Sequence, residues 1–415
     1  MIVRLLIIVT VATLGIIPNS KAQIENNWVF GKYAGIDFEQ SPPQTFTSNI
    51  FKYTGSTSND TVSSYASSSI SDCQGNLLFY TNGCRIWDST HQVMNNGNLG
   101  CYNPNNLIEP LSTYIIPKPG SNNKYYVFYS WGSSNSDGFY YSIVDMSQAN
   151  GKGSVKQKNQ LIKQSTSTSY LTVVEHQNNK DYWLVFLTSP SNSPNSNYRF
   201  YAYPLTQNGI GLPVISHVNL YLGITTKRIL KSTPNGQHLI LNARSQIGFN
   251  TFITLRYDFD KNTGNINNKQ GILKRGQVHP SAAYVKHRGI AVSPNNQLIY
   301  LNTTYALPGQ EDQIYQVKNI ENAPHQTALE IRKMYGNLDL QVAPNNKIYF
   351  IYHSGITQYH LGAIQNPNIR GTGCNVQDSV INVAPLKTGE SLPRIYRPTP
   401  DINFKVKSTC KDTIE

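Results

Sequence analysis

Histidines, cysteines and carboxylates are the residues of this chain that could carry out chemistry, and their spacing limits which reactions are open. The nine histidines are dispersed, without an H-E-x-x-H or H-x-H pattern, and no cysteine pair has metal-ligand spacing. The G-x-S-x-G turn of serine hydrolases is absent as well. The patterns therefore predict no metal site and no nucleophilic triad, although four histidines could meet at a common axis: His238, His279, His287 and His353.

Acidic residues suggest two other chemistries. Asp258, Asp260 and Asn262 alternate ahead of Gly264, as oxygen ligands do in a calcium loop, but the glycine comes one place late and the closing glutamate is missing. We expect a polar hairpin there. Two carboxylates could serve as the acid and base of a glycosidase. The sequence couples no two of the candidates, which are Asp72, Glu175, Asp181, Glu311 and Asp312.

The elements that would position such residues come from a phrase that recurs six times. Its clearest copy, Ser67–Trp87, has a short strand, a turn at Asp72–Asn76 and a second, apolar strand. Glycine or asparagine stands in the turn, where a tight hairpin needs positive φ. The intervals between copies, about 48 to 60 residues, are typical of propeller blades. The register residues are Gly75, Asn123, Asn179, Gly236, Asn296 and Asn346.

These copies, with a further strand group at each end of the chain, predict an all-β propeller. We expect seven blades of four antiparallel strands, and six or eight blades also fit the pattern. A propeller must close, because an open blade edge would aggregate. We therefore expect the two termini to share the closing blade, with Asp401–Phe404 as a short strand near the C-terminal end.

The amino terminus has the pattern of a signal peptide. Arg4 supplies a positive charge, an apolar run follows, and small residues precede a cleavage site between Ala22 and Gln23. We expect residues 1–22 to be removed, residues 23–405 to form the propeller, and residues 406–415 to be a tail or the start of a further domain. No later run is apolar enough to span a membrane. The predicted location is secreted or at the cell surface.

Charge and cysteine content say something about partners and environment. The net charge is +12, so an exported protein of this kind could meet an acidic glycan, but the positive residues form no stripe for nucleic acid.

Five cysteines are too few for a disulfide scaffold. Cys84 with Cys101 is the disulfide that we expect, since Cys73 lies at the other end of the same strand. Cys374 and Cys410 could pair only if the chain end folds back.

Several phrases resemble the N-terminal β-propeller of large Bacteroidetes surface proteins, a family that carries PKD-type domains and a type 9 secretion or gliding-motility sorting domain. The resemblance implies a secreted or surface propeller. This chain ends near the point where such proteins begin their next domain, so we expect a truncated or stand-alone propeller. The phrases are NNWVFGKYAGIDF at 26–38, SISDCQGNLLFYTNGCRIWDSTHQVM at 69–94, YIIPKPGSNNKYYVF at 114–128, LDLQVAPNNKIYF at 338–350, LGAIQNPNIRGTGC at 361–374 and SLPRIY at 391–396.

Together these patterns predict an exported module for binding, adhesion or scaffolding, without catalysis or a cofactor, that recognises a surface protein or an acidic glycan. Two alternatives stay open: a propeller hydrolase or lyase acting on a lactone or polysaccharide, and an accessory component of the type 9 secretion or gliding machinery. Acids or histidines clustered around the central channel would favour the enzyme. Loops of a propeller converge on its axial face, so the candidate binding residues are Asp72, Asn82, Ser189, Arg244, Thr303 and His353.

Overall fold

The computed structural model describes most of the chain beyond the predicted signal peptide. The described residues are 23–50, 66–100, 102–103, 106–107, 109–132, 137–165, 170–188, 198–218, 229–244, 252–273, 285–305, 312–319, 328–334, 336, 339–353, 359–383 and 391–398. Within them the regular elements are β-strands and two short 3₁₀ turns, η1 (Ala149–Gly151) and η3 (Gly371–Cys374). No helix of this part is long and apolar enough to cross a membrane.

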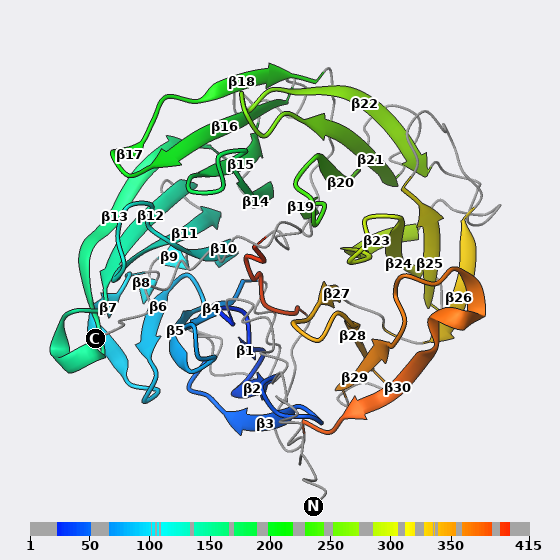
Figure 1. Cartoon of the computed structure of the whole chain (residues 1–415), viewed down its shortest axis with the longest axis horizontal. Coiled ribbons are helices and arrows are strands. Elements are labelled where there is room, and N and C mark those ends of the chain that lie inside the picture. Colours follow the sequence, from blue (N-terminus) through cyan, green and yellow to red (C-terminus); the bar gives the residue numbers. More distant parts are fainter. Residues whose placement is uncertain are drawn as a thin grey trace, which may run out of the picture.

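Most strands pair in antiparallel order with their neighbours in the sequence (Figure 1). The first sheet contains β1 (Asn27–Phe30), β2 (Ala34–Asp37) and β3 (Gln44–Thr47). The next two groups are β4 (Ser68–Ser71), β5 (Leu77–Thr81), β6 (Arg85–Asp88) and β7 (Val93–Asn98), and then β10 (Glu109–Pro117), β11 (Lys124–Gly132), β12 (Gly138–Asp145) and β13 (Ser154–Gln164). A ribbon lies between them in the chain, made of β8 (Tyr102–Asn103) and β9 (Asn106–Leu107).

The second half of the chain repeats the same unit four times. The first of these sheets holds β14 (Tyr170–Glu175), β15 (Tyr182–Thr188), β16 (Arg199–Thr206), β17 (Gly209–Ile210) and β18 (Val214–His217), and the second holds β19 (Ile229–Ser232), β20 (His238–Arg244), β21 (Phe252–Phe259) and β22 (Ile266–Leu273). The last two hold β23 (Val285–Val292), β24 (Leu298–Tyr305), β25 (Asp312–Lys318) and β26 (Leu329–Met334), and then β27 (Asp339–Val342), β28 (Ile348–His353), β29 (Tyr359–Ile364) and β30 (Val376–Ile381).

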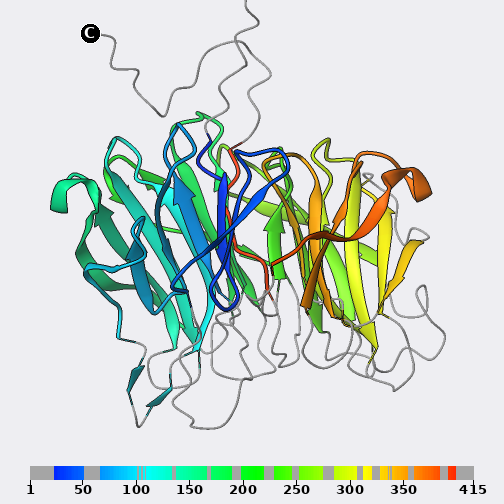
Figure 2. The same ribbon diagram turned by 90° about the horizontal axis from the view of Figure 1, so that it is seen from below.

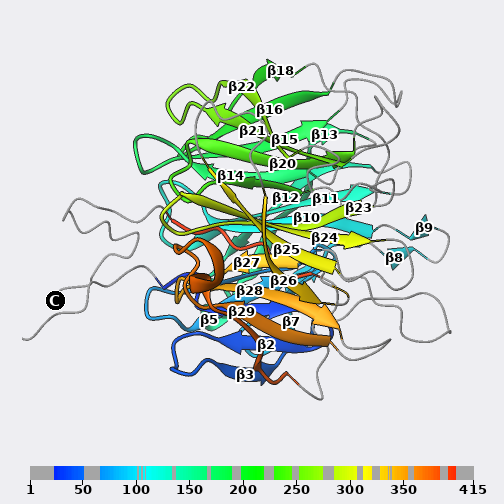
Figure 3. The same ribbon diagram turned by 90° about the vertical axis from the view of Figure 1, so that its right-hand side faces the viewer.

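The sheets stand around one axis, and the first strand of each lies nearest to it (Figure 1), while the strands run between the two faces of the ring (Figures 2 and 3). This confirms the all-β, propeller-like prediction. Strand pairing does not confirm seven four-stranded blades. The first sheet has three strands and the β14–β18 sheet has five, while β4–β7 and β10–β13 are joined into one sheet by a parallel pair between Ser154 and Asn95.

The repeated turns adopt the conformation that their glycines and asparagines predict. In one copy Asn296 donates its N–H to the carbonyl of Ser293 at 2.8 Å, and its φ of 63° is left-handed. The copy around Asn123 differs, because its left-handed residue is Gly120. The register residues with positive φ are Gly75, Asn179, Gly236, Asn296 and Asn346.

Aromatic side chains join neighbouring sheets. Phe186 of β15 stacks on Phe139 of β12 with ring centroids 4.0 Å apart. Trp183, on the same strand, donates its indole N–H to the carbonyl of Lys261 at 2.8 Å, in the turn between β21 and β22. β15 is therefore covered on both faces, which explains why it is buried throughout.

The described part of the C-terminal segment lies at the centre of the ring (Figure 1). Residues 391–398 pair with no strand in the described part of the chain and run along the axis of the ring, where Figure 1 shows them in red at the centre. Arg394 donates its backbone N–H to the carbonyl of Ser67 at 2.8 Å. Within the described residues this segment joins no sheet. Asp401–Phe404 lies outside the described residues, so a closing blade shared by the two termini stays a prediction.

The cysteines agree in part with the prediction. Cys84 forms a disulfide, as expected, and Cys101 lies outside the described residues. Cys73 is disulfide-bonded too, at the opposite end of β5 from Cys84. Cys374 is a buried free thiol, so its pairing with Cys410 is ruled out.

Candidate functional site

A cavity of about 100 Å³ lies at the axis of the ring. Its wall is formed by the innermost strands of five sheets, β10, β14, β19, β23 and β27, and by the C-terminal segment. Residues of the turns that follow β19, β23 and β27 also line it, so the cavity lies toward the face of the ring that carries these turns. The lining residues are Tyr114, Thr172, Val173, Lys231, Ser232, Thr233, Pro234, Ala291, Val292, Pro294, Gln341, Val342, Asn346, Ile395, Tyr396, Arg397 and Pro398.

Lys231 is the central polar residue of this cavity. Its Nζ donates to the carbonyl oxygen of Leu340 at 2.7 Å and to Oε1 of Gln341 at 2.8 Å. An ammonium group has three N–H donors, whereas a neutral amine has two. The two acceptors therefore match the neutral amine and leave its lone pair available.

The electrostatic surroundings of Lys231 favour this neutral form. Burial inside the ring and the positive charge of Arg394 lower its pKa to about 7, against the opposing effect of Asp339. Desolvation disfavours a charged amine, so an enclosed lysine loses its proton well below its usual pKa. Lys231 is consequently poised to exchange a proton near neutral pH.

Asp339 and Arg394 form the layer behind Lys231. The Asp339 carboxylate accepts the backbone N–H of Leu340 at 2.8 Å and that of Leu392 at 3.1 Å, and it lies 3.6 Å from a guanidinium nitrogen of Arg394. Asp339 is 1% exposed, so these contacts replace the water that its charge would otherwise require. The pair fixes the C-terminal segment against the strand that supplies Leu340 and Gln341.

Arg397 and Tyr396 close another side of the cavity. The Nε of Arg397 lies 2.8 Å from the Glu25 carboxylate, and its Nη2 donates a hydrogen bond to Oδ1 of Asn346 at 3.2 Å. Tyr396 packs edge-on against Tyr182 with ring centroids 5.2 Å apart. Burial, then Tyr182, Glu175 and Glu25, raise the pKa of Tyr396 well above its usual value. The Tyr396 hydroxyl thus stays protonated and can only donate or accept hydrogen bonds at neutral pH.

The cavity lining has a one-sided charge. Its described lining contains two basic residues, Lys231 and Arg397, together with hydroxyl, amide and apolar side chains, and no aspartate, glutamate or histidine. The acids Asp339, Glu25 and Glu175 stand behind the lining. The cavity is therefore suited to proton transfer by an amine and to an anionic or oxygen-rich ligand, and it lacks two facing carboxylates.

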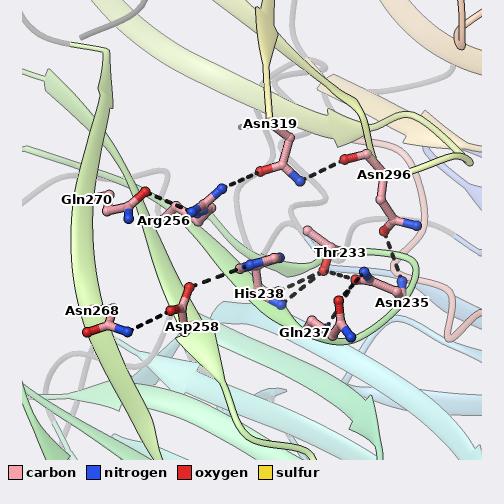
Figure 4. A network of polar contacts seen from close by, with 10 residues as sticks. All are labelled: Thr233, Asn235, Gln237, His238, Arg256, Asp258, Asn268, Gln270, Asn296 and Asn319. Atoms are coloured by element: carbon pink, nitrogen blue, oxygen red, sulfur yellow. Dashed lines mark hydrogen bonds and ion pairs between the residues drawn. The ribbon is translucent and has the colours of Figure 1, made fainter. Parts of the chain in front are cut away.

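A polar network fixes the wall around Thr233 (Figure 4). Thr233 donates its hydroxyl to Oδ1 of Asn235 at 2.7 Å, and the N–H of Asn235 donates to Oδ1 of Asn296 on the next sheet at 3.0 Å. Behind them the buried Arg256 donates to Asn319 at 3.3 Å, and Asn319 donates to the carbonyl of Asn296 at 2.8 Å. These contacts join the β19–β22 and β23–β26 sheets where they border the cavity.

Of the binding residues proposed from the sequence, Asp72 and Asn82 do not line this cavity. Asp72 and Asn82 lie at opposite ends of β5, so they face opposite sides of the ring. Both stabilise turns: Asp72 Oδ1 accepts the N–H of Asn76 at 2.8 Å, and Asn82 Oδ1 accepts that of Cys84 at 3.0 Å. The idea of one shared axial face is thus wrong for these two. Arg244, Thr303 and His353 lie at or near the ends of β20, β24 and β28, and Ser189 lies outside the described residues.

The other sequence candidates are also accounted for. The Asp260 turn is the expected polar hairpin, since Oδ1 accepts the N–H of Asn262 at 2.8 Å. No cluster of three histidine, cysteine, aspartate or glutamate residues suited to a metal occurs in the described part of the chain. Glu175 is buried near Tyr396, Asp312 is buried on β25, and Asp181 pairs with the side chain of Asn178 at 2.7 Å. Glu311 lies outside the described residues.

Sequence reasoning missed the residues that line the cavity. Lys231 is the one charged residue of β19, ILKS, and a charge in a short strand is typical of a solvated position. Arg394 and Tyr396 lie in SLPRIY, and Gln341 lies in LDLQVAPNNKIYF, both of which carried the family resemblance. Those phrases were the available signal, although nothing in them predicted a path along the axis.

No family model matches this chain, and no curated protein matches it. Among solved structures, a protein of unknown function from Dyadobacter fermentans is 11% identical, with a TM-score of 0.42 over 66% of this chain and 84% of that one. An exo-β-1,3-galactanase from Phanerochaete chrysosporium is 12% identical, with a TM-score of 0.38 over 68% and 65%. A thermostable family-43 glycoside hydrolase is 7% identical, with a TM-score of 0.36 over 68% and 96%.

These comparisons correct the function predicted from the sequence. We expected a non-catalytic binding or scaffolding module, and this expectation is contradicted because the similar structures of named activity are enzymes. The prediction that the chain is not an enzyme is withdrawn with it. With identities of 12% or less and TM-scores below 0.5, the likenesses assign no reaction to this chain.

Proposed function

We propose that the axial cavity is the active site of a hydrolase that opens a small lactone or a similar ester. The observation that carries the proposal is Lys231, a cavity-lining amine with a pKa of about 7 whose two acceptors match its neutral form. A general base works best when its pKa lies near the working pH. Lys231 meets that requirement without a second catalytic residue to activate it.

The reaction follows from this placement. The Lys231 amine removes a proton from water as the water oxygen forms a bond to the lactone carbonyl carbon. The charge on the carbonyl oxygen is stabilised by hydrogen-bond donors of the lining, for which Tyr114, Tyr396 and Arg397 are the candidates. When the ring C–O bond breaks, the leaving alkoxide takes the proton from the Lys231 ammonium. The product is a hydroxycarboxylic acid, which ionises at neutral pH.

The size and lining of the cavity favour a small substrate. A cavity of roughly 150 Å³ holds benzene, so about 100 Å³ suits a smaller ring, such as a five-membered lactone. A glycosidase mechanism needs two facing carboxylates, and the lining has none. The lactone alternative is therefore preferred over cleavage of a polysaccharide within its chain.

The decisive experiment measures hydrolysis of γ-butyrolactone by base consumption at constant pH, with the purified chain from Gln23. We expect activity in the wild type and a loss of 100-fold or more in Lys231→Met, in line with the usual contribution of a general base. Lys180→Met is the matched control, because Lys180 is exposed in a turn and should retain full activity. Equal activity in all three proteins would refute the proposal.

We also propose that the chain is exported after cleavage between Ala22 and Gln23 and belongs with the Bacteroidetes surface propellers, as the sequence phrases suggest. Counting β4–β7 and β10–β13 as separate blades, and β1–β3 as another, supports a ring of seven. Removal of Arg4 and Lys21 with the signal peptide lowers the net charge from +12 to +10, which suits contact with an acidic glycan or surface protein outside the cell. Amino-terminal sequencing of the exported protein tests the first point: a start other than Gln23 would refute the cleavage site.

A further inference from the structure

We infer that the axial cavity is a proton-coupled carboxylate site, in which Lys231 gains a proton when the carboxylate of the hydrolysis product binds. The identity of the occupant rests on the proposed function. The coupling itself rests on the number of hydrogen-bond acceptors around Lys231 and on the charges that face it.

The hydrogen-bond count gives the first argument. The two acceptors of Lys231, the Leu340 carbonyl and Gln341 Oε1, satisfy both N–H groups of a neutral amine. Protonation adds a third N–H, for which the described residues supply no acceptor. A buried donor without a partner is costly. A carboxylate oxygen in the cavity would accept this third N–H and, unlike a water molecule, would also balance the positive charge of the ammonium form.

The charges around Lys231 give the second argument. Arg394 disfavours its protonation and Asp339 favours it. Of the other titratable residues of the lining, Arg397 is cationic, while Tyr114 and Tyr396 have raised pKa values and stay neutral. No described lining residue is acidic, and the carboxylate that acts on Lys231 from behind the lining, Asp339, is already paired with Arg394. An incoming carboxylate would supply a negative charge beside the amine and favour the ammonium form.

The coupling has a chemical consequence for the proposed reaction. Opening a lactone at neutral pH yields a carboxylate and one proton, and Lys231 is positioned to hold the proton while the carboxylate stays in the cavity. Product release must then be accompanied by loss of this proton to solvent. We expect the product to bind more tightly as the pH falls toward 7, and therefore to inhibit more strongly at lower pH.

Isothermal titration calorimetry with 4-hydroxybutyrate, the product of γ-butyrolactone opening, tests the inference. Titrations at pH 8 in phosphate and in Tris, which differ in ionisation enthalpy, report the number of protons taken up. We expect uptake approaching one proton per anion bound, and an affinity that weakens about tenfold per pH unit between pH 7.5 and 9. Uncharged 1,4-butanediol should show no proton uptake.

Variants sharpen the same measurement. Lys231→Met should lose the proton uptake, while Lys180→Met should retain it. Binding of 4-hydroxybutyrate by the wild type without proton uptake, or no binding by a protein that hydrolyses γ-butyrolactone, would overturn the inference. Proton-coupled binding without hydrolysis would support the inference and refute the proposed catalysis instead. The two ideas can thus fail separately, and the wild-type titration decides the inference even if a variant does not fold.

Discussion

Lys231 and Leu340 are 109 positions apart in the chain, and yet the Lys231 amine donates a hydrogen bond to the Leu340 carbonyl at 2.7 Å. Lys231 lies on β19 and Leu340 on β27, and the β23–β26 sheet comes between them in the sequence. At the axis, the two residues are therefore in contact although the β23–β26 sheet separates their own sheets in chain order. The contact forms because β19, β23 and β27 are the innermost strands of their sheets and stand around one axis (Figure 1).

The charges behind Lys231 should set the pH dependence of activity. A base must be deprotonated to act, so kcat/KM for lactone opening should rise with pH through about 7 and then level off. Asp339 raises the pKa of Lys231 and Arg394 lowers it. Asp339→Asn should thus move the midpoint of the profile to lower pH, and Arg394→Gln should move it to higher pH.

Opposite shifts are the informative outcome of these two pH profiles. Removing one partner of a buried ion pair costs about 3–5 kcal/mol, so circular dichroism must first show that each variant is folded. A midpoint that moves in the same direction in both variants, or in neither, would contradict the assignment of the titration to Lys231.

Stability should also depend on pH through Lys231. The folded chain releases this proton near pH 7, whereas an unfolded lysine holds its proton up to about pH 10.4. The unfolded state therefore binds more protons between these values, and the free energy of unfolding rises with pH there. Between pH 7 and 9, the wild type should gain about 2 kcal/mol relative to Lys231→Met.

Urea unfolding of both proteins at pH 7 and 9 measures this gain. Other groups titrate alike in the two proteins, so the difference between them isolates Lys231. If the wild type and Lys231→Met change equally between the two pH values, Lys231 has an ordinary pKa in the folded chain.

The sequence predicted the repeating hairpins but not the site, for reasons that particular residues make clear. Asn296 and Asn346 mark their turns because left-handed φ is a local property, readable from a few residues. The partners of Lys231 are non-local, since only closure of the ring brings Gln341 beside it. The predicted binding loops failed similarly, because one strand length separates Asp72 from Asn82 and places them on opposite faces.

Cys374 should be unreactive in the folded protein. It is a buried free thiol, and burial raises its pKa to about 11, so almost no thiolate is present at pH 8. Titration with a thiol-specific aromatic disulfide should give the same signal for native wild type and native Cys374→Ser. After denaturation the variant should show one thiol fewer. A difference between the native proteins would contradict the burial of Cys374.

The turn at Gly264 should be much less tolerant of substitution than an open turn of similar backbone shape. Gly264 has φ +77°, and a Cβ there would lie 2.7 Å from the ring of Trp183. Gly151 has φ +84° and no atom within 4 Å of such a Cβ. Gly151→Ala should therefore cost about 1 kcal/mol, for the left-handed conformation alone.

Gly264→Ala should cost a further 1–3 kcal/mol or so, because Trp183 must move from its place between two sheets. The indole N–H of Trp183 donates to Lys261 in the same turn, so displacing the ring also weakens that hydrogen bond. Urea unfolding of the two alanine variants beside the wild type gives both costs. Equal costs would mean that the turn does not press on Trp183 in solution. A larger cost at Gly264 would show that this contact between the β14–β18 and β19–β22 sheets contributes to the stability of the ring.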